Sequence, residues 1–229
     1  MRLLFIHGSG GSAESWHYQT NHFKKSIAVD LPGHPHGELL DTIDGCVDWL
    51  HDYVLKKDLR DLVLVGHSLG GGIALLYTLK YPERVKGIVT VGSGARLRVH
   101  PMTLEMLEKE VENPEHFGEF ATQSLALIEK DVADVMARRT IENGPAVMLN
   151  DLRACDRFDI MDRLEEIQVP LLALCGDQDI MTPPKYSSFM VSSINGAKAE
   201  IIQGGTHMVF AEKPEEVNKA IEDFINEIE

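Results

Sequence analysis

Apolar residues along the chain fall into two patterns. Short continuous runs, rich in branched side chains and bounded by Gly, Pro or Asp, cover residues 2–7, 26–30, 62–67, 87–92, 171–176 and 199–204. Such runs are typical of strands buried on both faces of a parallel sheet. Longer stretches with helical spacing lie between them, at 39–55, 69–80, 185–194 and 214–228. This alternation predicts an α/β fold, a doubly wound and mostly parallel sheet of about six strands with helices on both faces.

The stretch from 95 to 167 breaks the alternation, because it contains no convincing strand. It holds amphipathic patterns, including Leu104 and Leu107, that are interrupted by "NPEH" and "NGPA". We expect a helical insertion at the carboxyl end of the sheet, where α/β folds bind ligands. The predicted division is an α/β core of 1–94 and 168–229 and a helical lid or cap of 95–167. A helical segment that only completes the core would show the same pattern.

The composition is that of an ordinary globular protein, with 44% hydrophobic and 25% charged residues among 229. A formal net charge of −14, spread along the chain, disfavours nucleic acid or an anionic membrane as the main partner. The three cysteines are far apart and follow no ligand spacing, which disfavours disulfides and a zinc site. No apolar segment reaches membrane-spanning length. We expect a soluble cytoplasmic protein without a bound metal.

The segment "GHSLG" at 66–70 lies between a predicted strand and a predicted helix. It has the form G-x-S-x-G, which is informative here because a sharp strand-to-helix turn exposes the central serine. We expect Ser68 to adopt an unfavourable backbone conformation, with Gly66 and Gly70 removing side chains that would collide across the turn. A phosphate-binding loop is the alternative, but no P-loop pattern is present and no Lys or Arg occurs in 62–79.

A serine nucleophile needs a base that takes its proton and a third group that orients the base. His207 lies in "GGTHM" and is the only one of ten histidines that follows the last predicted strand. Asp177 and Asp179 in "CGDQD" end the preceding strand, and their spacing alone does not separate them. Four histidines near other turns are interpreted as turn or backbone-bonding residues; these are His7, His34, His36 and His67.

Acyl transfer also requires N–H donors that face the developing oxyanion. The loop "HGSGG" at 7–11 follows the first predicted strand, and its glycines let the backbone approach a substrate. One donor is expected from this loop. The other is expected to be the N–H of Leu69, at the N-terminus of the helix that follows the serine. A tight turn without a catalytic role would contain the same glycines.

The order of serine, aspartate and histidine on this strand–helix alternation resembles the α/β-hydrolase superfamily, in particular its serine esterases and lipases with a helical lid. The resemblance covers nearly the whole chain, in "HGSGGSAESW", "DLPGH", "GHSLGG", "GDQDIMTP" and "GGTHMVFAEKPEEV". It implies Asp179 as the acid, through a G-x-x-D-x-x-x-P pattern from Gly176 to Pro183, with Asp177 as the fallback. It also implies Ser9, the residue after His-Gly, as the backbone donor of the loop.

Members of this superfamily usually carry two strands before the His-Gly loop, which here starts close to Met1. The resemblance therefore implies a trimmed sheet in the family order 4-3-5-6-7-8, with the lid inserted between strands 6 and 7 and the 26–30 run at an edge. Lys24 and Lys25 beside that run discourage edge pairing. Our hypothesis is that this edge is either blunted or used for dimerisation, so we expect a monomer or a homodimer.

The resemblance implies hydrolysis of carboxylic esters, or thioesters, of small to medium apolar acyl or aromatic groups. Ser68 would carry the acyl group, His207 would take its proton, and the N–H groups of Ser9 and Leu69 would hold the oxyanion. No cofactor is required, and the expected partner is a small ester-like substrate. Apolar residues of the lid and loops are pocket candidates; these are Met102, Phe120, Met136, Phe158, Met181 and Met208.

Three alternatives fit the same resemblance. C–C bond hydrolases of ring-cleavage products use this triad with basic or polar pocket residues, for which the candidates are Arg96, Arg98, Arg153 and Arg157. Cofactor-free haloperoxidases and hydroxynitrile lyases have similar serine turns. Some members of the fold are non-catalytic ligand receptors. Ser68 argues against the epoxide hydrolases and haloalkane dehalogenases, which use an aspartate at this position.

Overall fold

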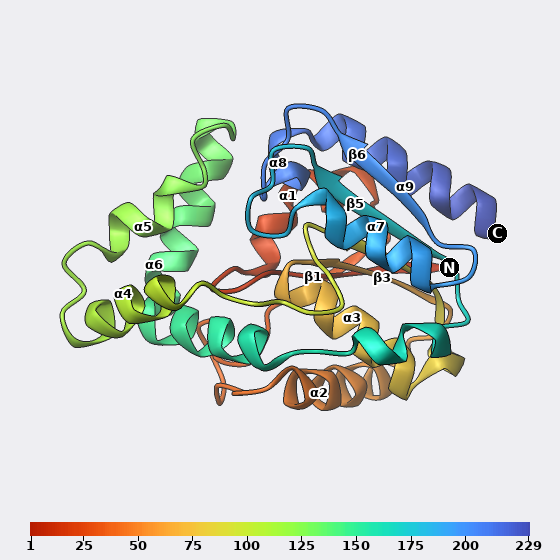
Figure 1. The fold of residues 1–229 in the computed structure, drawn as a ribbon, viewed down its shortest axis with the longest axis horizontal. Coiled ribbons are helices and arrows are strands. Elements are labelled where there is room, and N and C mark those ends of the chain that lie inside the picture. The colour runs from red at the N-terminus through yellow and green to blue at the C-terminus, as the bar shows by residue number, and fades with distance from the viewer.

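The computed structural model describes residues 1–229, and its centre is a six-stranded parallel sheet (Figure 1). The strands are β1 (Arg2–Ile6), β2 (Ile27–Val29), β3 (Leu62–His67), β4 (Val85–Val91), β5 (Leu171–Gly176) and β6 (Lys198–Ile202). Their order across the sheet is β2-β1-β3-β4-β5-β6, and every pairing is parallel. The predicted sheet and strand order are confirmed, and the carboxyl ends of all strands meet at one edge.

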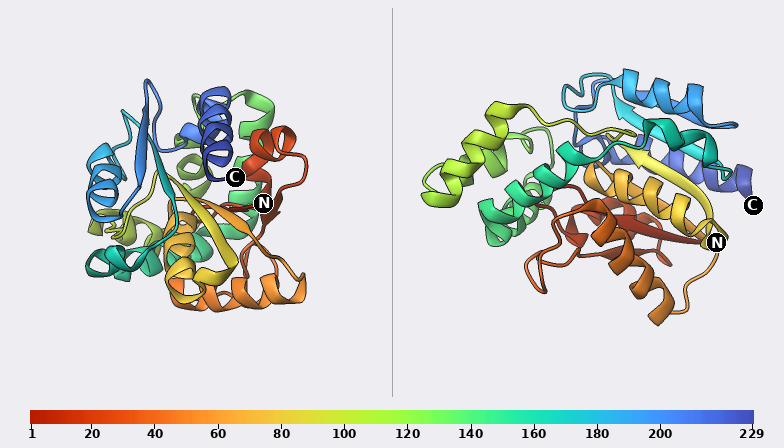
Figure 2. Two further views of the ribbon diagram at one scale, coloured as in Figure 1. Left: turned by 90° about the vertical axis from the view of Figure 1, so that its right-hand side faces the viewer. Right: turned by 60° about the horizontal axis from the view of Figure 1, so that its bottom comes forward.

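Helices cover both faces of the sheet (Figure 2). One face packs against α2 (Ile43–Lys56), α3 (Leu69–Lys80) and α7 (Pro184–Ser193). The other packs against α1 (His17–His22), α8 (Val209–Glu212) and α9 (Pro214–Ile228). Alternate residues of β1 feed the two cores, with Leu4 and Ile6 on the first face and Leu3 and Phe5 on the second. Burial on both faces explains why the strand runs are continuously apolar.

Three helices lie between β4 and β5 and project beyond the carboxyl edge of the sheet, away from both termini (Figure 1). They are α4 (Pro101–Glu112), α5 (Phe117–Gln123) and α6 (Lys130–Arg157), and together they are called the helical insertion. The segment "NPEH" separates α4 from α5, whereas "NGPA" kinks α6 at Gly144, which has a φ of 84°. Ala154 and Cys155 of α6 pack into the same core as α2 and α3. The division at 94/95 and 167/168 therefore stays a prediction.

The remaining elements are short. They are the 3-10 helices η1 (Ala13–Trp16), η2 (Pro82–Arg84) and η3 (Met161–Glu166). The sequence patterns did not predict η1, α1 or α8, which are too short to show a helical period. By contrast α9 occupies its predicted range, since Pro214 fits the first turn and Glu215 and Glu216 favour the helix dipole there. No helix is both long enough and apolar enough to cross a bilayer.

Candidate active site

Ser68 occupies a strained turn between β3 and α3. Its φ is 50° and its ψ is −114°, a combination that residues with a side chain rarely adopt. The N–H of Ser68 donates to the carbonyl of Val91 at 3.0 Å, and the hydroxyl of Ser93 donates to the carbonyl of Ser68 at 2.7 Å. These bonds hold the strained conformation expected from "GHSLG", at the carboxyl edge of the sheet.

The two glycines of this turn avoid collisions with different parts of the backbone. A Cβ atom on Gly66 would lie 2.1 Å from the carbonyl oxygen of Gly70, across the turn. A Cβ atom on Gly70 would lie 2.2 Å from the carbonyl oxygen of Ile6 in β1. Gly66 is therefore required by the turn itself, as expected, whereas Gly70 lets α3 approach the neighbouring strand.

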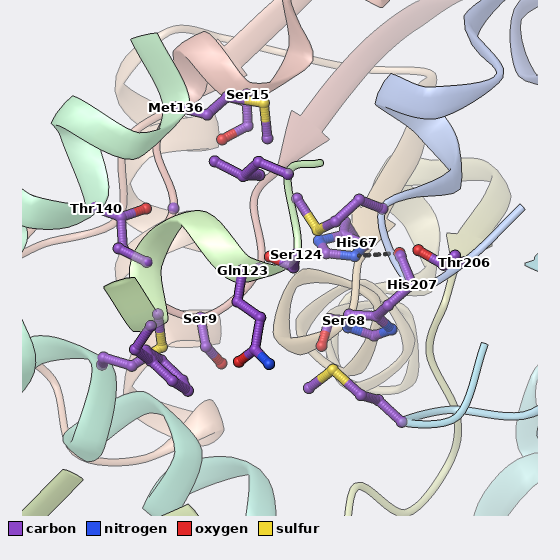
Figure 3. A pocket seen from close by; sticks show the side chains of 18 of the residues that line it. Ser9, Ser15, His67, Ser68, Gln123, Ser124, Met136, Thr140, Thr206 and His207 are labelled. Carbon is purple, nitrogen blue, oxygen red and sulfur yellow. Dashed lines mark hydrogen bonds between the residues drawn. The ribbon is translucent and has the colours of Figure 1, made fainter. Parts of the chain in front are cut away.

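His207 lies beside Ser68, in the loop between β6 and α8 (Figure 3). Its Nδ1 is 2.9 Å from Oδ2 of Asp179, whose side chain is fully buried. A carboxylate accepts hydrogen bonds, so Nδ1 carries the proton and Nε2 is free to act as a base. The structure thus brings together three residues that the sequence places far apart, each from a loop at the carboxyl edge.

Asp179 accepts hydrogen bonds from three further donors besides His207. The N–H groups of Met181 and Thr182 donate to Oδ1 at 2.9 Å each, and the Thr182 hydroxyl donates to Oδ2 at 2.7 Å. Burial by itself raises the pKa of Asp179, but the bonds from His207 and Thr182 outweigh it and lower the pKa to about 2. Asp179 is therefore ionised at neutral pH. No sequence motif marked the hydroxyl of Thr182 as a partner of Asp179.

Asp177 takes no part in this arrangement. Its side chain is exposed, and its Oδ1 accepts a hydrogen bond from the N–H of Gly204 at 2.7 Å. The geometry resolves the choice that spacing left open, because only Asp179 contacts His207.

His67 contacts His207 through a hydrogen bond and through ring packing. Its Nε2 donates to the carbonyl of His207 at 3.0 Å, and its ring packs against those of His207 and Phe210. Burial, together with the neighbouring His207, lowers the pKa of His67 to about 3, so the ring is neutral. The interpretation of His67 as a backbone-bonding histidine agrees with this contact, which fixes the loop that carries the base.

The two expected oxyanion donors are backbone N–H groups without an acceptor in the protein. The N–H of Ser9 donates to no group of the protein. Leu69 is the first residue of α3, where N–H groups have no partner inside the helix. Both N–H groups are therefore unoccupied by the protein, and Ser9 lines the same cavity as Ser68.

A cavity of about 580 Å³ opens over Ser68, between the carboxyl edge of the sheet and the helical insertion (Figure 3). All three helices of the insertion contribute to its wall, with Thr103 from α4, Gln123 from α5 and Met136 from α6. None of its 23 lining residues is Asp, Glu, Lys or Arg. No group of three or more His, Cys, Asp or Glu side chains is arranged to hold a metal ion. The cavity therefore suits an uncharged ligand.

Four of the six pocket candidates line this cavity, namely Phe120, Met136, Met181 and Met208. Met102 does not, since its side chain points to solvent and is 70% exposed. Phe158 does not either, because it is buried in the core shared with α2 and α3. Apolar character marks a residue for burial, but it does not indicate which side of a helix faces the cavity. Polar residues such as Gln123 and Thr140 also line the cavity, although none of the six apolar candidates indicated them.

The four arginines considered for a basic pocket lie elsewhere. Arg96 and Arg98 face Asp159, Arg153 pairs with Glu108, and Arg157 bonds the carbonyl of Asp41; none of the four lines the cavity.

The comparisons with known proteins agree with this architecture. The model of the alpha/beta hydrolase family matches residues 3–220, and the chain belongs to this family. It is 25% identical over 240 residues to a pimeloyl-[acyl-carrier protein] methyl ester esterase of Yersinia enterocolitica, covering 97% of this chain and 92% of that protein. It is 26% identical over 243 residues to the (E)-2-((N-methylformamido)methylene)succinate hydrolase of Acinetobacter baylyi, covering 97% and 89%. A solved thermophilic esterase superposes with a TM-score of 0.83 and 32% identity, covering 99% and 90%. The protein is accordingly a hydrolase.

Proposed function

We propose that this hydrolase cleaves uncharged carboxylic esters, or the corresponding thioesters, of small to medium apolar acyl or aromatic groups. The observation that carries the proposal is the contact between His207 and Asp179 beside Ser68, at the base of a cavity without charged side chains. The similarity to two proteins described as esterases supports it. The absence of arginine from the cavity wall disfavours the basic pocket of the C–C hydrolase alternative.

The proposed reaction has two halves. Nε2 of His207 takes the hydroxyl proton of Ser68, whose oxygen bonds to the carbonyl carbon of the ester. The N–H groups of Ser9 and Leu69 hold the negative oxygen, and each such donor contributes about 10²- to 10³-fold in rate. His207 then protonates the leaving alcohol. In the second half, water attacks the acyl group, His207 takes the proton of the water, and the carboxylic acid leaves Ser68.

The charge and the cysteines support further parts of the proposal. A formal charge of −14 favours a small uncharged substrate over nucleic acid or an anionic membrane as the partner. We propose a cytoplasmic protein, because all three cysteines are buried free thiols, as is common in a reducing compartment. A monomer or a homodimer is proposed because β2 is the outermost strand of the sheet and has one edge without a neighbouring strand.

A series of p-nitrophenyl esters of increasing acyl length tests the proposed activity. Wild type should hydrolyse the short and medium esters, and Ser68→Ala should lose at least about 10⁴-fold in kcat. The matched control is Ser9→Ala, which keeps the backbone N–H and should retain kcat within about threefold. Mass spectrometry of a slowly deacylating ester should place the acyl group on Ser68. Hydrolysis of no ester by wild type, or full activity in Ser68→Ala, would refute the proposal.

A further inference from the structure

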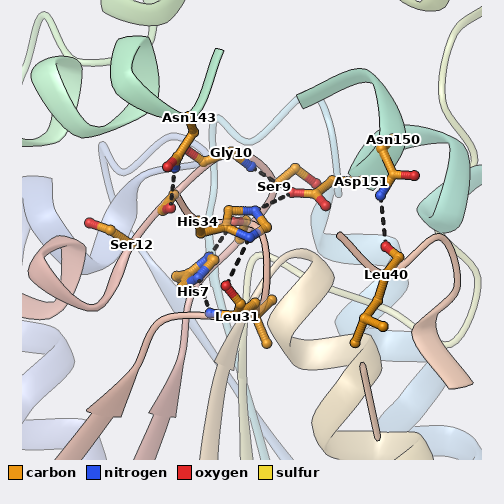
Figure 4. Close-up of polar contacts among 12 residues, drawn as sticks. His7, Ser9, Gly10, Ser12, Leu31, His34, Leu40, Asn143, Asn150 and Asp151 are labelled. Atoms are coloured by element: carbon orange, nitrogen blue, oxygen red, sulfur yellow. Dashed lines mark hydrogen bonds and ion pairs between the residues drawn. The ribbon is translucent and has the colours of Figure 1, made fainter. Parts of the chain in front are cut away.

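The loop that carries Ser9 is held by two side chains of α6 (Figure 4). Oδ2 of Asp151 accepts a hydrogen bond from the N–H of Gly10 at 2.8 Å. Nδ2 of Asn143 donates to the carbonyls of Gly10 and Gly11, at 2.9 Å and 2.8 Å. Asp151 and Asn143 are both buried, at 3% and 9% exposure. Both polar groups of Gly10 are thus bonded by the helical insertion.

The orientation of the Ser9 N–H is linked to these hydrogen bonds, because the peptide units between them are planar and rigid. The carbonyl of Gly8 shares a planar peptide with the N–H of Ser9, and it accepts from the N–H of Gly11 at 3.1 Å. That N–H in turn shares a peptide with the carbonyl of Gly10, which Asn143 holds. Asp151 fixes the peptide in between, since it bonds the N–H of Gly10. The carbonyl of Gly8 also accepts from Nδ1 of His7 at 2.8 Å, a contact that does not involve α6. The direction of the Ser9 N–H therefore depends on His7 on one side and, through the peptide units of Gly10 and Gly11, on α6 on the other.

The kink of α6 makes this double contact possible. Asn143 ends the first half of the helix, Gly144 breaks it with a φ of 84°, and Asp151 lies in the second half. Between them Met148 packs on the loop, so that a Cβ atom on Gly10 would lie 2.4 Å from its Cε. Both halves of α6 therefore contact the same loop.

A buried ion pair keeps the Asp151 carboxylate in place. Nε2 of His34 is 2.8 Å from Oδ2 of Asp151, and Nδ1 of His34 is 3.2 Å from the carbonyls of Leu31 and Pro32. Both ring nitrogens face acceptors, so the geometry favours the protonated ring. Burial alone lowers the pKa of His34, but the bond to Asp151 more than reverses this and raises it. His34 is therefore more than the backbone-bonding residue inferred from the sequence.

We propose that Asp151 and Asn143 are positioning residues of the oxyanion hole, which align the Ser9 N–H with the oxygen that becomes negative on Ser68. This inference rests on the proposed function. It assigns α6 a second role beyond lining the cavity, and it implies that α6 stays docked on the loop during the reaction. An N–H that is aligned before the reaction stabilises the transition state more than the bound ester.

The steady-state test compares substitutions in α6 that differ in what they contact. Asp151→Ala and Asn143→Ala should each lower kcat by about 10- to 100-fold while KM changes by less than about threefold. Asp151→Asn retains an acceptor for Gly10 and should fall between Asp151→Ala and wild type. The matched control is Asn150→Ala, which removes the 2.7 Å bond from α6 to the carbonyl of Leu40 but leaves the loop untouched. It should keep kcat within about twofold.

Two further measurements do not depend on the ester preference. Labelling of Ser68 by a fluorophosphonate needs the triad and the oxyanion hole but no particular acyl group, and it should slow in parallel with kcat in both alanine variants. Amide hydrogen exchange of Gly10 and Gly11, followed by NMR, should accelerate at least about tenfold in these variants and not in Asn150→Ala. A wild type that is labelled but cleaves no ester would refute the proposed function while leaving this inference testable by labelling and exchange.

Unchanged kcat, labelling and exchange in Asp151→Ala and Asn143→Ala would overturn the inference. The same loss of kcat in Asn150→Ala, or a rise in KM that accounts for the whole loss of kcat/KM, would also overturn it, since α6 would then act only as a wall of the cavity. If an alanine variant does not fold, Asp151→Asn provides the same comparison with Asn150→Ala.

Discussion

The hydroxyl of Thr182 donates to Oδ2 of Asp179 at 2.7 Å, and the same oxygen accepts from Nδ1 of His207 at 2.9 Å. The backbone N–H groups of Met181 and Thr182 bond the other carboxylate oxygen, so both oxygens of Asp179 are held. Thr182→Val keeps the shape of the side chain and removes only the hydroxyl, so it should lower kcat by about tenfold, equivalent to one hydrogen bond to a charged group. Thr182→Ser retains the hydroxyl and serves as the control in the same ester assay. Equal kcat values for the Val and Ser variants would contradict this role.

The two aspartates of the acid loop should differ sharply in their effect on activity. Asp179→Asn removes the orienting carboxylate and should lower kcat by about 10⁴-fold. Asp177→Asn retains an oxygen that can accept from Gly204 and changes an exposed group, so kcat should stay within about threefold. The assay uses the best p-nitrophenyl ester for all three proteins. A large loss in Asp177→Asn with none in Asp179→Asn would reverse the assignment.

Stability should decline in mild acid because of buried neutral histidines. The pKa of His67 is about 3 in the folded protein, whereas an unfolded histidine takes up a proton below about pH 6.5. The unfolded state therefore binds more protons between these values, and the free energy of unfolding falls as the pH drops through this window. His67→Gln should reduce the slope by up to about 1.4 kcal/mol per pH unit, measured by urea unfolding at pH 6.5, 5.5 and 4.5. An unaltered slope in the variant would show that His67 does not contribute.

Gly66 should tolerate no side chain. Its Cβ would lie 2.1 Å from a backbone oxygen, which cannot move away as a side chain can, so Gly66→Ala should cost at least about 3 kcal/mol or prevent folding. Gly118 in α5 has nothing within 4 Å of the same atom, and Gly118→Ala should gain up to about 1 kcal/mol from helix propensity. Urea unfolding compares the two variants. Similar stability in both would mean that the turn relaxes more than its contacts suggest.

The cavity should disfavour substrates whose acyl group carries a charge. Because no charged side chain lines it, a carboxylate buried there would lose hydration without gaining a partner. We expect the kcat/KM of a p-nitrophenyl ester of succinate, which carries one free carboxylate, to be at least about tenfold below that of p-nitrophenyl butyrate. Both acyl chains have four carbons, so size is matched. Equal values would indicate that the acyl group does not enter the cavity.

Local patterns in the sequence were sufficient for the strands, the longer helices and the Ser68 turn. A strand between two helical layers must be apolar throughout, and a strained strand-to-helix turn requires glycine at Gly66. Both requirements act on neighbouring residues, so they are visible in short segments. His207 was found from its position, because it is the only histidine after the last strand.

Contacts between distant residues were decided only by the tertiary structure. Asp179 and Asp177 are two residues apart, and the direction of each side chain depends on how the loop after β5 packs on that after β6. No sequence pattern indicated a role for Asp151, because its hydrogen bond with Gly10 forms only when the kinked α6 packs on the loop. The sequence by itself determined the fold and the serine and histidine of the site, since these depend on local backbone requirements. The family resemblance already favoured Asp179 over Asp177, and the tertiary structure placed Asp179 against His207. The tertiary structure alone decided the cavity wall and the contacts of the 7–11 loop, since these depend on how separate elements pack.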